Sequence, residues 1–226
     1  GGRASVVVAN LADAQGVETC IAAVKARHAE VHVLINNAGR SIRRPLLESL
    51  DRPHDFERTM QLNYFAPMRL TLGLLPGMLA RGEGQIINIS SVAALMTTPR
   101  FSAYLASKSA LDAFSRSLRI ELSGQGIAVT SINYPLVKTA MTEPTAVYRY
   151  LPQMDVEDAA QWIVDAVAER PARRTTPSAL VFYIATAIAP GPALKWLGDF
   201  YRRRGERLMK KLKADQARQA ASSSSV

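Results

Sequence analysis

Short apolar, often β-branched runs alternate along this chain with longer stretches that carry helical periodicity. Four of the runs predict strands, at residues 5–9, 31–35, 85–89 and 127–133. The stretches between and after them predict helices, at residues 13–29, 55–79, 101–122 and 156–169. Elements that alternate in this way predict an α/β fold, with a doubly wound parallel sheet covered by helices on both faces.

Prolines, glycines and a capping residue mark where the predicted helices break or end. Pro67 and Pro76 are expected to interrupt the helix at residues 55–79, because proline lacks the amide hydrogen that a helix interior needs. The two glycines at positions 82 and 84 are expected to end it. Asp155 is expected to cap the helix at residues 156–169.

Small and polar residues follow three of the predicted strands. Asn36-Asn37-Ala38-Gly39 comes after the second strand, Ser90-Ser91 after the third and Tyr134-Pro135 after the fourth. Open parallel sheets bind ligands beyond the carboxyl ends of their strands. We therefore expect the three clusters to face one crevice.

A tyrosine and a lysine lie four residues apart in the predicted helix at residues 101–122. This spacing places Tyr104 and Lys108 on one helix face, about one turn apart. On its own the pair is equally typical of an amphipathic helix whose lysine reaches out to water. Whether the pair is catalytic therefore depends on other residues of the sequence.

Further residues agree with the pair in type, order and spacing. Ser91 lies 13 residues before Tyr104, and Asn63 lies 28 residues before Ser91. With the Asn-Asn-Ala-Gly turn, the chain here resembles the short-chain dehydrogenase/reductase family, whose fold is of the Rossmann type. Within that family it is similar to the bacterial fatty acyl-CoA reductases in the stretches LINNAGRSIRRP, DFERTMQLNYF, GQIINISSVAAL, RFSAYLASKSALDAFSR and PLVKTAMTEPT.

The resemblance implies a catalytic tetrad of Asn63, Ser91, Tyr104 and Lys108. Tyr104 would be the acid/base, and Lys108 would lower its pKa and bind a ribose hydroxyl. Ser91 would hydrogen-bond the substrate oxygen. Its rival Ser90 should point to the opposite face, because neighbouring side chains of a strand alternate. Asn63 would anchor a water that leads protons from Lys108, although a buried helix amide bonding to backbone is its alternative role.

The resemblance also implies a nicotinamide cofactor and the residues that would contact it. NADPH is expected, while NADH stays open, because the strand end that would choose between them is not recognised in this chain. Asn10 stands where the family usually has an aspartate at the adenine, and Leu136 where most members have glycine. The implied cofactor-binding residues are Asn10, Asn37, Ala38, Gly39, Tyr104, Lys108, Pro135, Val137 and Thr139.

Against the family pattern, the chain is expected to lack the first two βα units, which carry the glycine-rich phosphate loop. We therefore expect residues 1–194 to form an incomplete Rossmann domain and residues 195–226 a basic C-terminal helix and tail. Without the phosphate loop, we expect these 226 residues alone to bind NADPH weakly. The open sheet edge predicts poor solubility or pairing with another chain, so a homo-oligomer stays open.

Composition and charge exclude several other classes of protein. One cysteine, Cys20, and three scattered histidines predict neither a disulfide framework nor a metal site. The net charge of +9 is concentrated from Lys195 to Val226, where nine Lys and Arg face three acids. We expect a solubilising end there, no nucleic-acid partner, and a cytoplasmic protein without a membrane span. An interfacial helix with Trp196, Leu197, Phe200 and Tyr201 beside residues 202–204 is the alternative, which would give a peripheral membrane contact.

We therefore predict an NADPH-dependent reductase that converts long-chain fatty acyl-CoA to fatty aldehyde. The apolar residues Leu95, Met96, Phe101 and those at 141–150 would line an acyl channel or belong to the core. Two alternatives stay open. One is an alcohol or ketone dehydrogenase acting on another lipid-like carbonyl substrate, and the other is a catalytically inactive binding or membrane-peripheral protein.

Overall fold

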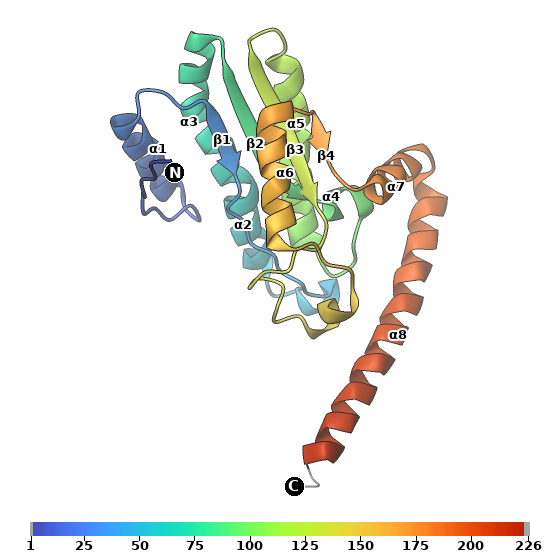
Figure 1. Cartoon of the computed structure of the whole chain (residues 1–226). Helices are drawn as coiled ribbons and strands as arrows, with labels where there is room; N and C mark the ends of the chain where they lie inside the picture. Colours follow the sequence, from blue (N-terminus) through green and yellow to red (C-terminus); the bar gives the residue numbers. More distant parts are fainter. Residues whose placement is uncertain (1, 224–226) are drawn as a thin grey trace.

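The computed structural model describes the backbone of residues 2–223, and side chains through residue 207 except at position 206. It contains a four-stranded parallel sheet surrounded by helices (Figure 1). The elements in chain order are α1 (Ala14–Arg27), β1 (Val33–Asn36), η1 (Leu46–Glu48), α2 (Pro53–Met60), η2 (Gln61–Phe65), α3 (Ala66–Arg81), β2 (Gly84–Ser91), α4 (Ala93–Met96), α5 (Ser102–Glu121), β3 (Ile127–Tyr134), η3 (Ala146–Tyr150), α6 (Val156–Glu169), β4 (Arg173–Arg174), α7 (Pro177–Ile188) and α8 (Pro190–Ser223).

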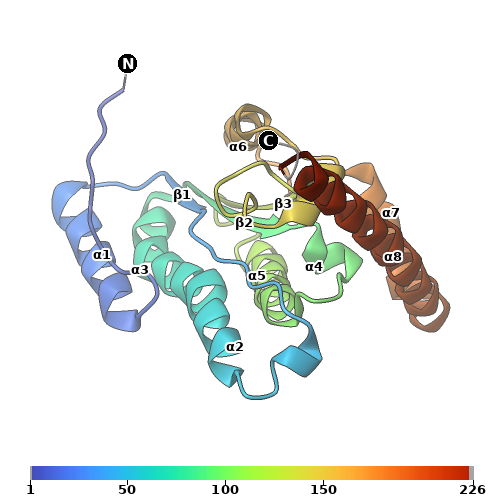
Figure 2. The same cartoon turned by 90° about the horizontal axis from the view of Figure 1, so that it is seen from below.

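The sheet has the order β1-β2-β3-β4, and every pair is parallel. In the central pair, Gly84 lies opposite Ile127 and Ser91 lies opposite Tyr134. Helices α2, α3 and α5 cover one face and α6 covers the other (Figure 2). The doubly wound α/β fold predicted from the alternation of elements is confirmed.

Side-chain alternation along β2 builds the two layers of the core. Ile86 points to one face, where it packs with Met78 of α3 and Leu118 of α5. Ile87 and Ile89 belong to the cluster that packs against α6. Both faces of this strand are buried, and its buried polar side chains are paired: Gln85 donates to the carbonyl of Ala166 and Asn88 to the hydroxyl of Ser115.

The predicted strand at residues 5–9 is wrong. The structure gives these residues no regular secondary structure, and the side chains of Val6 and Val8 are 78% and 92% exposed. A β-branched run becomes a strand only where a neighbouring strand pairs with its backbone. In the described part of the chain β1 pairs with β2 alone, so residues 5–9 have no such neighbour.

The helix predicted at residues 55–79 is broken, but not where its prolines are. A π-helical turn, η2, separates α2 from α3. Pro67 is the second residue of α3, which follows η2 without a gap, and Pro76 lies inside that helix, so neither proline ends it. Gly82 ends α3 with a φ of 68°, a left-handed conformation that favours glycine.

The C-terminal elements were not predicted in detail. Asp155 is at the N-cap of α6, as expected, although its side chain makes no capping hydrogen bond there. After the short edge strand β4, α7 packs against α4 and α8. The predicted division at residue 195 lies inside α8 and stays a proposal.

Candidate active site

The two serines at the carboxyl end of β2 point in different directions. Ser90 is buried, and its hydroxyl donates to the carbonyl oxygen of Lys108 at 3.4 Å. The hydroxyl of Ser91 accepts a hydrogen bond from the amide of Ala93 at 3.2 Å and faces the phenol of Tyr104, whose pKa it lowers. The alternation of the strand therefore places Ser91, and not Ser90, against Tyr104.

Tyr104 projects from the first turn of α5 and is half-buried. Burial raises its pKa above the usual value, and the hydrogen bond with Ser91 partly offsets that rise. The ring of Phe101 meets the ring of Tyr104 edge-on, with centroids 6.2 Å apart. The phenol is therefore protonated at neutral pH and lies beside an apolar ring.

Lys108 is buried one turn further along α5, with 5% of its surface exposed. Its Nζ donates to the carbonyl oxygen of Ile89 in β2 at 2.7 Å. Burial lowers its pKa from 10.5 to about 8. In this arrangement burial dominates the pKa of the phenol and the ammonium is directed to Ile89, so the role of Lys108 in lowering the pKa of Tyr104 stays a proposal.

Asn63 lies in the π-helical turn and is completely buried. Its Oδ1 accepts from the amide of Arg40 at 2.8 Å, and its Nδ2 donates to the Arg40 carbonyl at 2.9 Å. Nδ2 also donates to the hydroxyl of Ser107 at 2.9 Å, which in turn donates to the carbonyl of Tyr104 at 2.7 Å. Asn63 therefore ties the loop after β1 to the helix that carries Tyr104.

The Asn-Asn-Ala-Gly turn after β1 combines a structural and an accessible part. Asn36 is buried, and its Nδ2 donates to Oδ1 of Asn88 at 2.8 Å. Asn37 and Ala38 are exposed. A Cβ on Gly39 would lie 3.3 Å from the Oδ1 of Asn63 and 3.4 Å from the Nζ of Lys108, so only a residue without a side chain fits comfortably.

The segment after β3 lies at the same end of the sheet. Pro135 and Val137 are half-buried, and Val137 pairs with Met154 in a parallel bridge. Thr139 is exposed, and its amide donates to the hydroxyl of Thr142 at 3.0 Å. The segment is thus held by backbone and hydroxyl contacts at the carboxyl edge of the sheet.

Residues 1–147 match the sequence profile of the short chain dehydrogenases. The chain belongs to the short-chain dehydrogenase family. It is 52% identical over 190 residues to a fatty acyl-CoA reductase from Acinetobacter baylyi, a match that covers 84% of this chain and 64% of that protein. It is 44% identical over 209 residues to a fatty acyl-CoA reductase from Mycobacterium tuberculosis, covering 92% of this chain and 70% of that protein.

Solved structures agree with this membership. A short-chain dehydrogenase from Streptomyces avermitilis has a TM-score of 0.68 and 28% identity, covering 87% of this chain and 79% of that one. A gluconate 5-dehydrogenase from Burkholderia cenocepacia, in complex with NADP and tartrate, has a TM-score of 0.55 and 26% identity, covering 60% and 52%. The chain thus spans just under two thirds of the length of the Acinetobacter relative.

Asn10, another predicted site residue of this short-chain dehydrogenase, makes only local side-chain contacts, as Thr139 does. It is exposed at the start of α1, where its Nδ2 donates to Asp13 at 2.7 Å and its Oδ1 accepts from the amide of Ala12 at 3.0 Å. These contacts form the turn that begins the helix. The adenine role of Asn10 stays a prediction.

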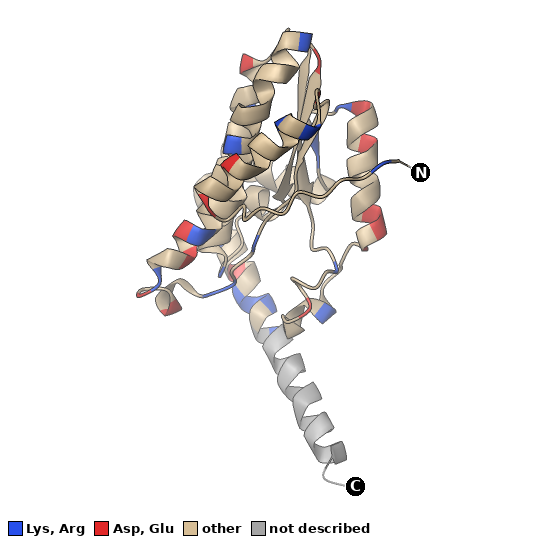
Figure 3. Cartoon of the chain, turned by 90° about the vertical axis from the view of Figure 1, so that its left-hand side faces the viewer, with Lys and Arg blue, Asp and Glu red and all other residues tan. Residues whose placement is uncertain are grey.

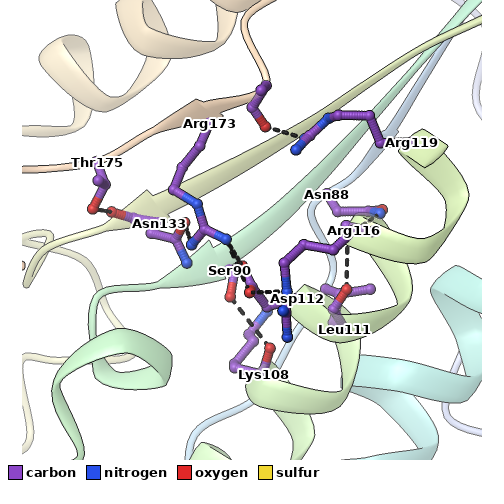
Figure 4. Close-up of polar contacts among 12 residues, drawn as sticks. Asn88, Ser90, Lys108, Leu111, Asp112, Arg116, Arg119, Asn133, Arg173 and Thr175 are labelled. Atoms are coloured by element: carbon purple, nitrogen blue, oxygen red, sulfur yellow. Dashed lines mark hydrogen bonds and ion pairs between the residues drawn. The ribbon is translucent and has the colours of Figure 1, made fainter. Parts of the chain in front are cut away.

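An ion pair links α5 to β4 next to the candidate site, and it was not predicted from the sequence (Figure 4). Asp112, one turn after Lys108, pairs with Arg173 of β4 at 3.0 Å. Arg173 also donates to Oδ1 of Asn133 at 3.0 Å, and the Nδ2 of Asn133 donates to the carbonyl of Ser91 at 3.3 Å. Two signals in the sequence are the position of Asp112 on the same helix face as Lys108 and its four-residue spacing to Arg116, which also pairs with Asp112 at 3.4 Å.

Two further features concern metal-binding clusters and membrane-spanning helices. Among the described residues, no group of three or more His, Cys, Asp or Glu is arranged to hold a metal ion. None of the helices in that part of the chain is both long and apolar enough to cross a bilayer.

Proposed function

We propose that this protein is an NADPH-dependent oxidoreductase that reduces long-chain fatty acyl-CoA to fatty aldehyde. The observation that carries the proposal is the placement of Tyr104 and the buried Lys108 one turn apart on α5, against the carboxyl end of β2 where Ser91 lies and where Nζ of Lys108 donates to Ile89. Its thioester substrate is proposed from the 52% identity to a relative named fatty acyl-CoA reductase. The predicted cytoplasmic location stays a prediction.

The residues at this edge fit a nicotinamide dinucleotide. Gly39 leaves the room beside Lys108 that a side chain would fill, so a ribose can approach the ammonium. Exposed Asn37 and Ala38 flank it, and the half-buried Pro135 and Val137 would bracket the nicotinamide. When bound, the cofactor supplies a hydride. The choice of NADPH over NADH rests on the family resemblance.

The hydroxyls of Ser91 and Tyr104 form a pair of donors for one carbonyl oxygen. As hydride adds to the thioester carbon, negative charge develops on that oxygen, and both hydroxyls stabilise it. Tyr104 then transfers its proton and the product is a hemithioacetal. When the hemithioacetal breaks its carbon–sulfur bond, its hydroxyl proton returns to Tyr104, and the CoA thiolate leaves with a proton from solvent.

The electrostatics of the pair suit the reducing direction. The raised pKa of Tyr104 keeps the phenol protonated before hydride transfer, as a proton donor requires. Lys108, with its pKa near 8, can lose or accept a proton close to neutral pH. Asn63 is proposed to position the Tyr104 turn through Ser107, and its predicted role in anchoring a water stays a proposal.

Apolar side chains beside the phenol are suited to an acyl chain. Phe101 contacts the Tyr104 ring, and Tyr148 is half-buried near the same phenol. Met96 is half-buried as well. Leu95, at 3% exposure, belongs to the core instead. The donor pair would serve a ketone equally well, so an alcohol or ketone dehydrogenase is the second proposal.

The decisive experiment measures CoA release and NADPH oxidation by the full-length protein with palmitoyl-CoA. We expect the two to rise together, and Tyr104→Phe to leave less than about a hundredth of the rate with cofactor affinity nearly unchanged. Lys108→Ala should damage both. NADPH oxidation with a ketone but not with the thioester would support the second proposal, and a fully active Tyr104→Phe variant would contradict both.

A further inference from the structure

Helix α7 carries an exposed apolar face. Leu180, Val181, Ile184 and Ile188 fall on one side of the helix, since their positions span about 100° around its axis. All four are exposed, Val181 by 68% and Ile188 by 78%. The twelve residues of α7 include no charged side chain. Surfaces of this kind mark interaction sites in soluble proteins.

The first half of α8 adds aromatic and cationic side chains beside α7. Trp196 stacks on Phe200, with ring centroids 5.5 Å apart, and the guanidinium of Arg204 lies 5.7 Å from the Phe200 centroid. Together with Asp199, Arg203 and Arg207 they line one shallow hollow. Trp196 also reaches Phe182 of α7, at 6.0 Å between centroids, so the two helices lie side by side. Figure 3 shows the Lys and Arg cluster in this part of α8.

The charge of this segment is strongly one-sided. Residues 195–207 contain five cations, Lys195, Arg202, Arg203, Arg204 and Arg207, against the acids Asp199 and Glu206. Asp199 is already paired with Arg202 at 2.8 Å. Leu197 is buried and holds the helix in place, so it does not take the part in an interfacial helix considered from the sequence.

We propose that α7 and the first half of α8 form a docking surface for an anionic lipid bilayer. The apolar face of α7 enters the acyl boundary, Trp196 and Phe200 lie at headgroup level, and the arginines bind lipid phosphates. Twelve residues of helix rise about 18 Å, less than the thickness of a bilayer core, so α7 lies on the membrane. This inference is independent of the proposed reaction.

Other occupants fit the surface less well. A second copy of the chain would bring two sets of arginines together, and their repulsion opposes a symmetric contact. A nucleic acid would match the arginines but leave the apolar face of α7 in water. An anionic bilayer accounts for both kinds of side chain.

Vesicle co-sedimentation tests the proposal. We expect the protein to bind vesicles of phosphatidylglycerol and phosphatidylcholine mixed equally, to bind pure phosphatidylcholine far less, and to be released by high salt. The variant Arg203→Gln/Arg204→Gln/Arg207→Gln should bind the mixed vesicles about a hundredfold more weakly. The matched control Lys25→Gln/Arg58→Gln, which removes exposed cations of α1 and α2, should bind like the wild type.

Tryptophan fluorescence tests the apolar part separately. The chain has two tryptophans, so Trp162→Phe leaves Trp196 as the reporter. We expect its emission to shift to the blue on the mixed vesicles, and Ile184→Asp to weaken binding without changing the circular dichroism spectrum. Equal binding to both vesicle types, or full binding by the triple variant, would overturn the proposal. So would dimerisation in solution that Ile184→Asp abolishes, since it would assign the face to a second copy.

Discussion

Lys108→Met is expected to change how the stability of the protein depends on pH. In the folded state the ammonium of Lys108 is buried and its pKa falls from 10.5 to about 8. In the unfolded chain the same group is surrounded by water and keeps its ordinary pKa. Folding therefore disfavours the protonated form, and this unfavourable contribution is present in full below pH 8.

The size of the effect follows from the two pKa values. Their difference corresponds to about 3 kcal/mol of destabilisation at low pH, which declines from pH 8 to 10.5 and vanishes above that range. Between pH 7 and pH 10, the wild type should gain about 2–3 kcal/mol relative to Lys108→Met. The lost hydrogen bond to Ile89 shifts the variant by the same amount at every pH, so it cancels from the comparison.

Urea denaturation of both proteins across this pH range measures the difference. The free energy of unfolding of the variant, subtracted from that of the wild type, should rise steadily with pH. Lys25→Met is the matched control, because Lys25 is exposed on α1 and its ammonium stays in water in both states. A difference in unfolding free energy that stayed constant from pH 7 to pH 10 would contradict this prediction, because it would show that burial does not lower the pKa of Lys108.

Three further predictions concern packing, the ion pair and the C-terminus. Gly39→Val should destabilise the protein by about 1–3 kcal/mol, because its Cβ meets two buried polar groups. Gly77→Ala on α3 should not, because its Cβ meets only the end of the Arg81 side chain at 3.9 Å; thermal unfolding compares the two variants. Arg173→Met should lower the free energy of unfolding by less than the about 3 kcal/mol expected for an unpaired buried charge, because Arg116 still pairs with Asp112 at 3.4 Å; additivity with Asp112→Asn in a double-mutant cycle would contradict a direct pair. Deleting residues 208–226, whose side chains lie outside the described part, should leave the reaction rate unchanged; loss of vesicle binding on deletion would contradict a passive tail.

The sequence by itself determined the order of the main elements and much of the site. Alternation within β2 selected Ser91 over Ser90, and the four-residue spacing placed Tyr104 and Lys108 on one face of α5. These features depend on side-chain patterns within a few turns of chain, which a short window of sequence contains.

Only the tertiary structure decided the rest, because it depends on residues far apart in the chain. Residues 5–9 have strand composition, yet they form no strand without a neighbour to pair with. Asp112 pairs with its helix neighbour Arg116, but its closer partner is Arg173, 61 residues away. The pKa of Lys108 is lowered by all that buries it rather than by any one neighbour in sequence. Strand pairing, burial and the pKa of a buried group depend on the assembled fold, so a local sequence pattern can suggest them but does not determine them.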